Sequence, residues 1–246
     1  SFPDGMDLAE VTMAQRLKAM GYRTAAIGKW HLGDTDEQYP TKRGFDTFYG
    51  LREGSRSYFY DSKKDDKPGN YRAIEQDGTQ VKFDGYLTDV LGEEAIRFLK
   101  QQRHEPFFLM VSHYAVHVPH AARPELIEKY RQLPRGKFLK DDDYLPVDEM
   151  PKGKVISSWR LQYAAMLEEV DEGLGAMVEA VEKTGQLDNT FIIFTSDNGG
   201  GLTPNGALSG GKANLYEGGL RVPFVVAGPG VKAGAQCDVP IVQWDL

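Results

Sequence analysis

The sequence predicts an α/β fold in which helices sandwich a largely parallel central sheet. Segments with helical periodicity alternate with strand candidates along the chain. Those candidates are short and continuously apolar, as expected for strands covered on both faces. The 246 residues allow one large domain or two small ones, and 41% hydrophobic with 26% charged residues is a globular composition. No internal repeat interrupts the alternation.

The chain opens with a helix predicted over residues 7–20, where apolar side chains recur at helical spacing. Asp7 can cap the first turn, and Glu10 stands at the reciprocal capping-box position. Gly21 suits the left-handed residue that often ends a helix. A short strand is predicted next, at residues 24–28.

Two polar stretches predict surface excursions within this domain. Residues 34–84 are rich in Gly, Lys and Asp and contain an aromatic cluster within residues 45–60, and we expect the charged run 63–67 to be solvated. Residues 133–154 form the second excursion. Its triplet 141–143 lacks the alternating Asp spacing and central Gly of a calcium loop, so we expect it to be exposed.

The rest of the chain continues the alternation of helices and strands. The predicted segments are helix 88–100, strand 107–111, a short helix at 125–131, the longest helix at 158–184, strand 191–195, a Gly-rich loop and strand 223–227. An apolar stripe at helical spacing runs along the longest helix, and Gly185 ends it.

Charge and hydropathy exclude two classes of partner. The 29 Lys and Arg residues against 36 Asp and Glu give a net charge of −7, which argues against a nucleic-acid-binding surface. No apolar run approaches the roughly 20 residues that a membrane-spanning helix needs. The single Cys cannot form a disulfide within the chain.

Chemically active side chains follow three predicted strands where each strand ends. They are Lys29, Trp30 and His31 after the first strand, His113, His117 and His120 after strand 107–111, and Asp197, Asn198 and then Lys212 after strand 191–195. The carboxyl ends of parallel strands form the ligand-binding edge of such sheets, so we expect these groups to converge there. Taken singly, each of these residues also has an ordinary structural explanation. Asp-Asn-Gly, for example, is a common turn sequence.

Two apparent motifs do not hold. Residues 206–213 nearly match a phosphate-binding loop, but Ala213 replaces the hydroxyl residue that binds magnesium, and the following glycines argue against a long helix there. His113 and His117 have the spacing of a helical zinc pair, but the motif's Glu is missing and Pro119 disfavours a helix at Val118.

Several motifs together resemble the formylglycine-dependent sulfatases of the alkaline phosphatase superfamily. Residues 21–33, with the sequence GYRTAAIGKWHLG, closely resemble the second sulfatase signature. Further matches, in the order of the family, are residues 106–109, 117–120, 188–190, 195–199, 211–212, 216–223 and 245–246. The resemblance spans essentially the whole chain and implies an alkaline-phosphatase-like α/β fold over residues 1–246.

The resemblance implies roles that suit the cleavage of an anionic ester. Lys29 and Lys212 would hold the sulfate oxygens, with Lys212 also near the leaving group. His117 would contact the substrate and is the candidate general acid. His31 would hydrogen-bond the nucleophile and help to expel sulfate from the covalent intermediate.

The resemblance also implies a metal ion. Asp197 and Asn198 would ligate calcium, with magnesium as the alternative, through hard oxygen donors. We interpret Glu217 and Arg221 as a structural ion pair that brackets a Gly-Gly turn.

The nucleophile of the family has no counterpart in this sequence. It arises from the Cys or Ser of a C/S-x-P-x-R motif, which is converted to formylglycine. Residues 1–5 begin like this motif but have Gly in place of Arg, and in residues 237–240 the Pro comes one place too late. The paired Asp residues of the family's metal site are also missing before Gly21. We therefore expect a fragment that is incomplete at both ends and inactive alone, with formylglycine upstream of Ser1.

The expected function of the intact protein is hydrolysis of a sulfate monoester of an aryl compound or carbohydrate. Two alternatives remain open: a phosphoesterase or phosphonate hydrolase of the same superfamily, and a non-catalytic protein that binds sulfated ligands. A zinc hydrolase using His113 and His117 is a more distant alternative. The resemblance favours a periplasmic or extracellular location.

Overall fold

The computed structural model describes residues 5–101, 105–132, 158–201 and 205–246. The predicted excursion at 133–154 and the motif-like start of the chain, Ser1–Asp4, lie outside the described residues. The chain divides into two compact units, Ser1–Ala180 and Val181–Leu246, and each is described by itself.

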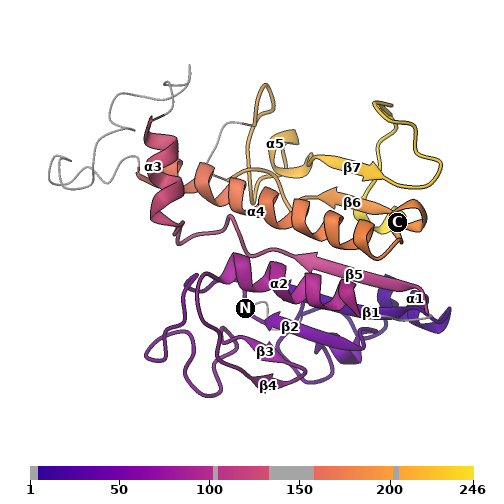
Figure 1. The fold of residues 1–246 in the computed structure, drawn as a ribbon, viewed down its shortest axis with the longest axis horizontal. Coiled ribbons are helices and arrows are strands. Elements are labelled where there is room, and N and C mark those ends of the chain that lie inside the picture. The colour runs from indigo at the N-terminus through magenta and orange to yellow at the C-terminus, as the bar shows by residue number, and fades with distance from the viewer. Residues whose placement is uncertain (1–4, 102–104, 133–157, 202–204) are drawn as a thin grey trace, which may run out of the picture. The chain divides into compact units, whose positions relative to one another are not determined.

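A mixed five-stranded sheet forms the centre of the first unit (Figure 1). Its order is β4-β3-β2-β1-β5, with β1 at Arg23–Lys29, β2 at Thr47–Leu51, β3 at Glu75–Gln76, β4 at Thr79–Gln80 and β5 at Phe107–Ser112. The strands β2 and β5 both pair with β1 in parallel, so that Ile27 lies between Tyr49 and Val111. The short β3 and β4 add an antiparallel edge. An α/β fold is thus confirmed.

Helices cover both faces of this sheet because β1 is apolar on both sides. Side chains alternate along a strand, so Ala26 and Ile27 point to opposite faces. Ala26 packs in one core cluster with Ala14 of α1 (Met13–Ala19). On the other face, Ile27 and Phe98 of α2 (Leu87–Lys100) line the same small cavity. Such two-sided burial explains the continuous apolar run of β1.

The first helix begins later than the sequence predicts. Thr12, not Asp7, is its N-cap: the Gln15 backbone N–H donates to the Thr12 hydroxyl at 3.1 Å, and the Gln15 side chain accepts from the Thr12 N–H. Asp7 caps a separate turn through the Ala9 N–H at 2.9 Å. Both sites offer a capping residue, and a tertiary contact selects Thr12, whose hydroxyl also donates to the Arg43 carbonyl.

The prediction of a surface excursion over residues 34–84 is wrong for much of this range. The segment contributes β2 to the interior of the sheet, and its Phe48 and Tyr58 are buried. Its charged run is not wholly solvated either, because Asp65 and Asp66 are 1% and 3% exposed. The sequence pattern does not reveal strand β2 because the strand has only five residues and lies between polar stretches. Two of its residues are also only half-buried.

The remaining elements complete the two units. They are α3 (Pro124–Gln132), α4 (Ser158–Lys183), α5 (Glu217–Leu220), β6 (Ile192–Thr195), β7 (Phe224–Ala227) and the short 3₁₀ helices η1 (Pro40–Lys42), η4 (Leu187–Asn189) and η5 (Gln243–Asp245). In the second unit, β6 pairs antiparallel with β7, as their opposed arrows show in Figure 1. No described helix is long and apolar enough to cross a membrane.

Candidate functional site

The carboxyl ends of β1 and β5 lie side by side, and polar side chains follow both. Gly28 of β1 is opposite Ser112 of β5, so Lys29 and the residues after Ser112 leave the sheet at the same edge. A Cβ on Gly28 would lie 1.9 Å from the Ser112 carbonyl oxygen. Glycine is therefore required for the two strands to approach this closely where the site begins.

His31, two residues after the end of β1, has an unusual backbone conformation. Its φ is 52°, in the left-handed region, and its N–H donates to the Arg52 carbonyl at 2.9 Å. Its imidazole lies against Gly54, where a Cβ would come within 2.7 Å of the ring. Partial burial, followed by the positive charge of Lys29, lowers the pKa of His31. The fold thus favours a neutral imidazole beside an ammonium group.

His117 is fixed by the segment that follows β5. Its ring lies 5.6 Å from the ring of Tyr114, centroid to centroid, and its Nδ1 lies 2.8 Å from the Val118 carbonyl oxygen. Because a carbonyl oxygen can only accept, Nδ1 carries a proton in this contact. The buried Tyr58 hydroxyl donates to the His117 carbonyl at 2.8 Å. Both the backbone and the ring of His117 are therefore positioned.

A turn after β2, residues 54–56, connects the surroundings of the two histidines. At one end, Gly54 contacts the His31 ring. At the other, the Arg56 N–H donates to the Tyr114 hydroxyl at 3.1 Å, and the Ser55 hydroxyl donates to the Val118 carbonyl at 3.3 Å. Sequence reasoning missed this turn. The available signal is the Gly-Ser-Arg run three residues after the end of β2, which has no meaning as a strand-end segment unless β2 is recognised.

A fully buried ion pair anchors that turn. The Arg56 guanidinium and the Asp66 carboxylate are both 0% exposed, with two hydrogen bonds of 3.0 and 2.8 Å between them. Arg56 also donates to the Arg72 carbonyl at 2.8 Å. Such two-point pairing fixes the orientation of the guanidinium.

Burial acts on the other two histidines of this segment, His113 and His120. Burial lowers the pKa of His113 to about 4, and neither of its ring nitrogens has a hydrogen-bond partner. Burial also lowers the pKa of His120, whose ring packs edge-on against Tyr163. His113 and His117 do not share a helix, and the described residues contain no group of three or more His, Cys, Asp or Glu suited to a metal. A zinc site at this pair therefore has no support in the described part of the chain.

The second unit carries the other predicted site residues. Asp197 and Asn198 follow β6, and the Ser196 hydroxyl donates to the Asn198 carbonyl at 2.9 Å. Lys212 is exposed, and its N–H donates to the Gly200 carbonyl at 3.2 Å. The loop that contains Lys212 is therefore hydrogen-bonded to the loop that follows Asn198, and we call the two together the loop cluster.

Glycines make this loop cluster compact. A Cβ on Gly199 would lie 1.9 Å from the Gly218 carbonyl oxygen. The expected Glu217–Arg221 ion pair is present at 3.6 Å, between the first residue of the short helix α5 and the residue that follows it. No helix starts at Lys212 in the described residues, consistent with rejecting a phosphate-binding loop.

The donor chemistry of Asp197 and Asn198 fits a divalent cation in part. The carboxylate of Asp197 is on an exposed residue, and Asn198 beside it offers an amide oxygen, which are the hard donors that calcium and magnesium prefer. Two residues supply fewer than the six to eight ligands that calcium takes. Other parts of the protein would have to complete the shell.

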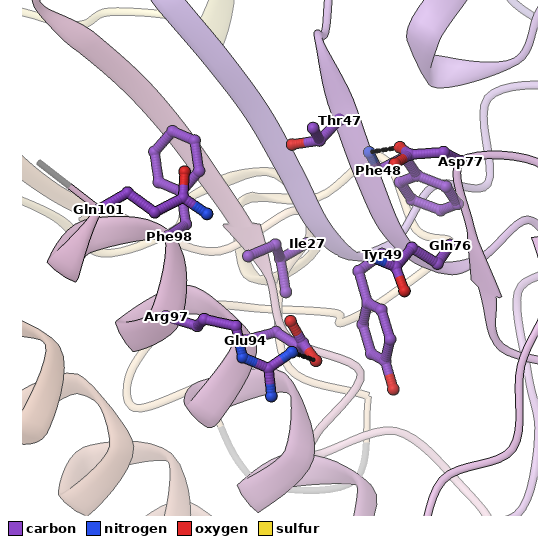
Figure 2. Close-up of a pocket in the computed structure, with 10 residues that line it drawn as sticks. All are labelled: Ile27, Thr47, Phe48, Tyr49, Gln76, Asp77, Glu94, Arg97, Phe98 and Gln101. Carbon is purple, nitrogen blue, oxygen red and sulfur yellow. Dashed lines mark hydrogen bonds and ion pairs between the residues drawn. The ribbon is translucent and has the colours of Figure 1, made fainter. Parts of the chain in front are cut away.

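The first unit contains a small cavity. It has a volume of about 110 Å³ and is bounded by side chains of α2 and β2, among them Tyr49, Arg97 and Phe98 (Figure 2). The Glu94–Arg97 ion pair lies at its rim. No predicted site residue lines it, so it does not bear on the chemistry proposed below.

Comparisons with known proteins agree on one family. The model of the family described as Sulfatase matches residues 4–246. Mouse arylsulfatase J is 35% identical over 254 residues, a match that covers 98% of this chain and 39% of that protein. Human N-acetylgalactosamine-6-sulfatase is 31% identical, with 94% of this chain and 42% of that protein covered.

Solved structures give the same picture. The crystal structure of Ps i-CgsB in complex with k-i-k-neocarrahexaose is similar with a TM-score of 0.77 and 33% identity, covering 94% of this chain and 50% of that chain. The chain therefore spans about two fifths of the length of the curated relatives and half of this solved neighbour.

Proposed function

This chain belongs to the sulfatase family, and on that premise we propose that the whole protein hydrolyses a sulfate monoester of a carbohydrate or aryl compound. Among the relatives, the human N-acetylgalactosamine-6-sulfatase is named for a sugar sulfate, and Ps i-CgsB was solved in complex with k-i-k-neocarrahexaose. These names favour a carbohydrate substrate. The family resemblance also favours a location outside the cytoplasm.

One observation of this structure carries the proposal. Lys29, His31 and His117 follow two paired parallel strands at one sheet edge, and the 54–56 turn contacts the surroundings of both histidines. An ammonium group and two imidazoles at one edge suit an anionic ester whose leaving oxygen must be protonated.

Each side chain has a proposed part in the reaction. Lys29 and Lys212 bind sulfate oxygens and stabilise their negative charge. His117, with one proton held at Nδ1 by the Val118 carbonyl, passes a second proton from Nε2 to the leaving oxygen. His31, whose pKa is lowered, is suited to accept a proton from the nucleophile's hydroxyl.

The metal and the nucleophile complete the proposal. Asp197 and Asn198 would hold calcium, or magnesium, which when bound would neutralise charge on the sulfate. The nucleophile would be a formylglycine on a part of the protein outside these 246 residues, because no C/S-x-P-x-R motif occurs within them.

Substitution of the two proposed sulfate-binding lysines in the whole protein tests the proposal. We expect Lys29→Met and Lys212→Met each to lower kcat/KM for a sulfate ester by about 100-fold or more, because each removes a positive charge proposed to stabilise the sulfate oxygens. Lys232→Met, which removes an exposed lysine of the second unit, is the matched control and should change kcat/KM by less than about twofold.

The same assay separates the alternatives. Preferred hydrolysis of the phosphate ester over the matching sulfate ester would replace the proposal with a phosphoesterase. Binding of the sulfate ester without any turnover by the whole protein would replace it with a non-catalytic binding function. Equal activity of all three lysine variants would refute the sulfate-binding role assigned to Lys29 and Lys212.

A further inference from the structure

We infer that Tyr114 is a positioning residue for His117, acting through the Val118 carbonyl that holds the proton at Nδ1. The inference rests on the proposed function, because it concerns the delivery of a proton by His117. Tyr114 itself is not proposed to touch the substrate. Its hydroxyl would set where the imidazole points and which of its nitrogens faces the ester.

The Val118 carbonyl oxygen is the centre of this arrangement. It lies 2.6 Å from the Tyr114 hydroxyl, 2.8 Å from His117 Nδ1 and 3.3 Å from the Ser55 hydroxyl. All three neighbours can donate, and a carbonyl oxygen can only accept. The contact to Tyr114 is the shortest, so Tyr114 is the main restraint on where this oxygen lies.

The proton count at Tyr114 supports a fixed orientation of its hydroxyl. The oxygen accepts the Arg56 N–H at 3.1 Å, which leaves its single proton for an acceptor. Two carbonyls are within reach, Val118 at 2.6 Å and Arg56 at 2.9 Å. The Arg56 N–H already donates to the Tyr114 hydroxyl. If this hydroxyl donates its proton to the Val118 carbonyl, the nearer of the two, it has one donor and one acceptor as partners.

The support behind the hydroxyl is rigid. Tyr114 is 2% exposed, and its ring packs against that of Tyr58 at 4.8 Å between centroids. The backbone that donates to it belongs to Arg56, whose side chain is anchored by the buried pair with Asp66. The restraint on the Val118 carbonyl therefore extends from a buried ion pair, through one hydroxyl, to an imidazole.

The arrangement has a specific chemical consequence. With Nδ1 committed to Val118, proton transfer to a leaving oxygen takes place from Nε2. If the Val118 carbonyl shifts, the His117 ring can rotate. Its Nε2 then no longer lies within hydrogen-bond reach of the leaving oxygen. The loss should be largest for esters whose leaving group is strongly basic, since these depend most on protonation.

The experiment measures kcat and KM of the whole protein for a series of aryl sulfates, from 4-nitrophenyl sulfate to phenyl sulfate. We expect Tyr114→Phe to lower kcat for phenyl sulfate by about tenfold, with KM and the rate for 4-nitrophenyl sulfate changed by less than about twofold. The dependence on leaving-group basicity would thereby become steeper.

Tyr86→Phe is the matched control. Tyr86 is 4% exposed, its ring stacks with that of Tyr58 at 5.4 Å between centroids, and its hydroxyl donates to the Ala121 carbonyl at 2.8 Å. Its substitution removes an equally buried hydroxyl from a carbonyl of the same segment without touching Val118. We expect an unchanged dependence on the leaving group.

Equal slopes for wild type, Tyr114→Phe and Tyr86→Phe would overturn the inference while leaving the proposed function intact. Absence of sulfatase activity in the wild type, or no loss in His117→Gln, would instead remove the proposed function on which it rests. Should Tyr114→Phe fail to fold, ¹⁵N-histidine NMR of the wild type decides. The neutral His117 should carry its proton on Nδ1, and the opposite tautomer would overturn the inference.

Discussion

At the scale of single residues, the buried pair of Arg56 and Asp66 illustrates how unequally ion pairs contribute to the stability of the fold. Both side chains are 0% exposed, whereas Glu217 and Arg221 are 63% and 69% exposed. Removing one partner of a buried pair leaves the other charge without compensation in a poorly solvated place. An exposed pair has water as an alternative partner, so its net contribution is small.

Substitution of Asp66 should therefore be costly. We expect Asp66→Asn to lower the free energy of unfolding by about 3–5 kcal/mol. Glu217→Gln, at the exposed pair, should lower it by less than about 1 kcal/mol. Urea unfolding of both variants checks the difference. A loss at Asp66 as small as that at Glu217 would show that the pair is solvated in solution.

His113 gives a residue-scale prediction about pH. Burial lowers its pKa in the folded protein to about 4 from the ordinary 6.5, so the unfolded chain binds the proton first. The stabilisation from keeping His113 neutral is complete above pH 6.5 and is lost as the pH falls towards 4. At about pH 5 the loss should be about 2 kcal/mol.

The substitution His113→Asn should remove this dependence. We expect the free energy of unfolding of the variant to fall by about 2 kcal/mol less than that of the wild type between about pH 7.5 and about pH 5. Urea unfolding at the two pH values provides the measurement. Parallel losses in both proteins would show that His113 is accessible to water.

At the scale of elements, the first helix shows where local patterns are ambiguous. Asp7 with Glu10 and Thr12 with Gln15 both match the pattern of a helix start. The apolar spacing continues through residues 8–11 and so favours the earlier start. The chain takes the later one because the Thr12 hydroxyl also donates to the Arg43 carbonyl, a partner 31 positions away. No local pattern reports such a contact.

The two capping residues should differ when substituted. We expect Thr12→Ala to lower the free energy of unfolding by about 1–2 kcal/mol, because it removes a cap and a tertiary hydrogen bond. Thr12→Ser retains the hydroxyl and should recover most of the loss. Asp7→Ala should cost less than Thr12→Ala, and thermal unfolding of the three variants would reveal the reverse order if the helix began at Asp7.

At the scale of the whole molecule, the residues with proposed roles are distributed over both compact units. Lys29, His31 and His117 belong to Ser1–Ala180, and Asp197, Asn198 and Lys212 belong to Val181–Leu246. The chain spans 39% of mouse arylsulfatase J, and it carries no C/S-x-P-x-R motif. The groups proposed to bind sulfate and to protonate the leaving oxygen are thus on this chain, while the proposed nucleophile is not.

Residues 1–246 alone should therefore be inactive. We expect no turnover of 4-nitrophenyl sulfate by this segment, because the proposed nucleophile and part of the metal shell are missing. The whole protein, assayed in parallel with added calcium, should hydrolyse the ester. The opposite result would be that the segment turns the ester over and that Lys29→Met abolishes this turnover. This result would show that a residue of this chain is the nucleophile.

The sequence by itself determined the α/β class, the family and the chemical types present at the strand ends. These depend on periodicity and on short motifs, such as residues 21–33, which are local in the chain. The tertiary structure decided which residues support the proposed site. Strand β2 becomes visible only through its pairing with β1, and Asp66 becomes a structural anchor only through Arg56, ten positions away. Tyr114 likewise gains its significance from Arg56, 58 positions away, because a hydrogen bond depends on distance in space rather than along the chain.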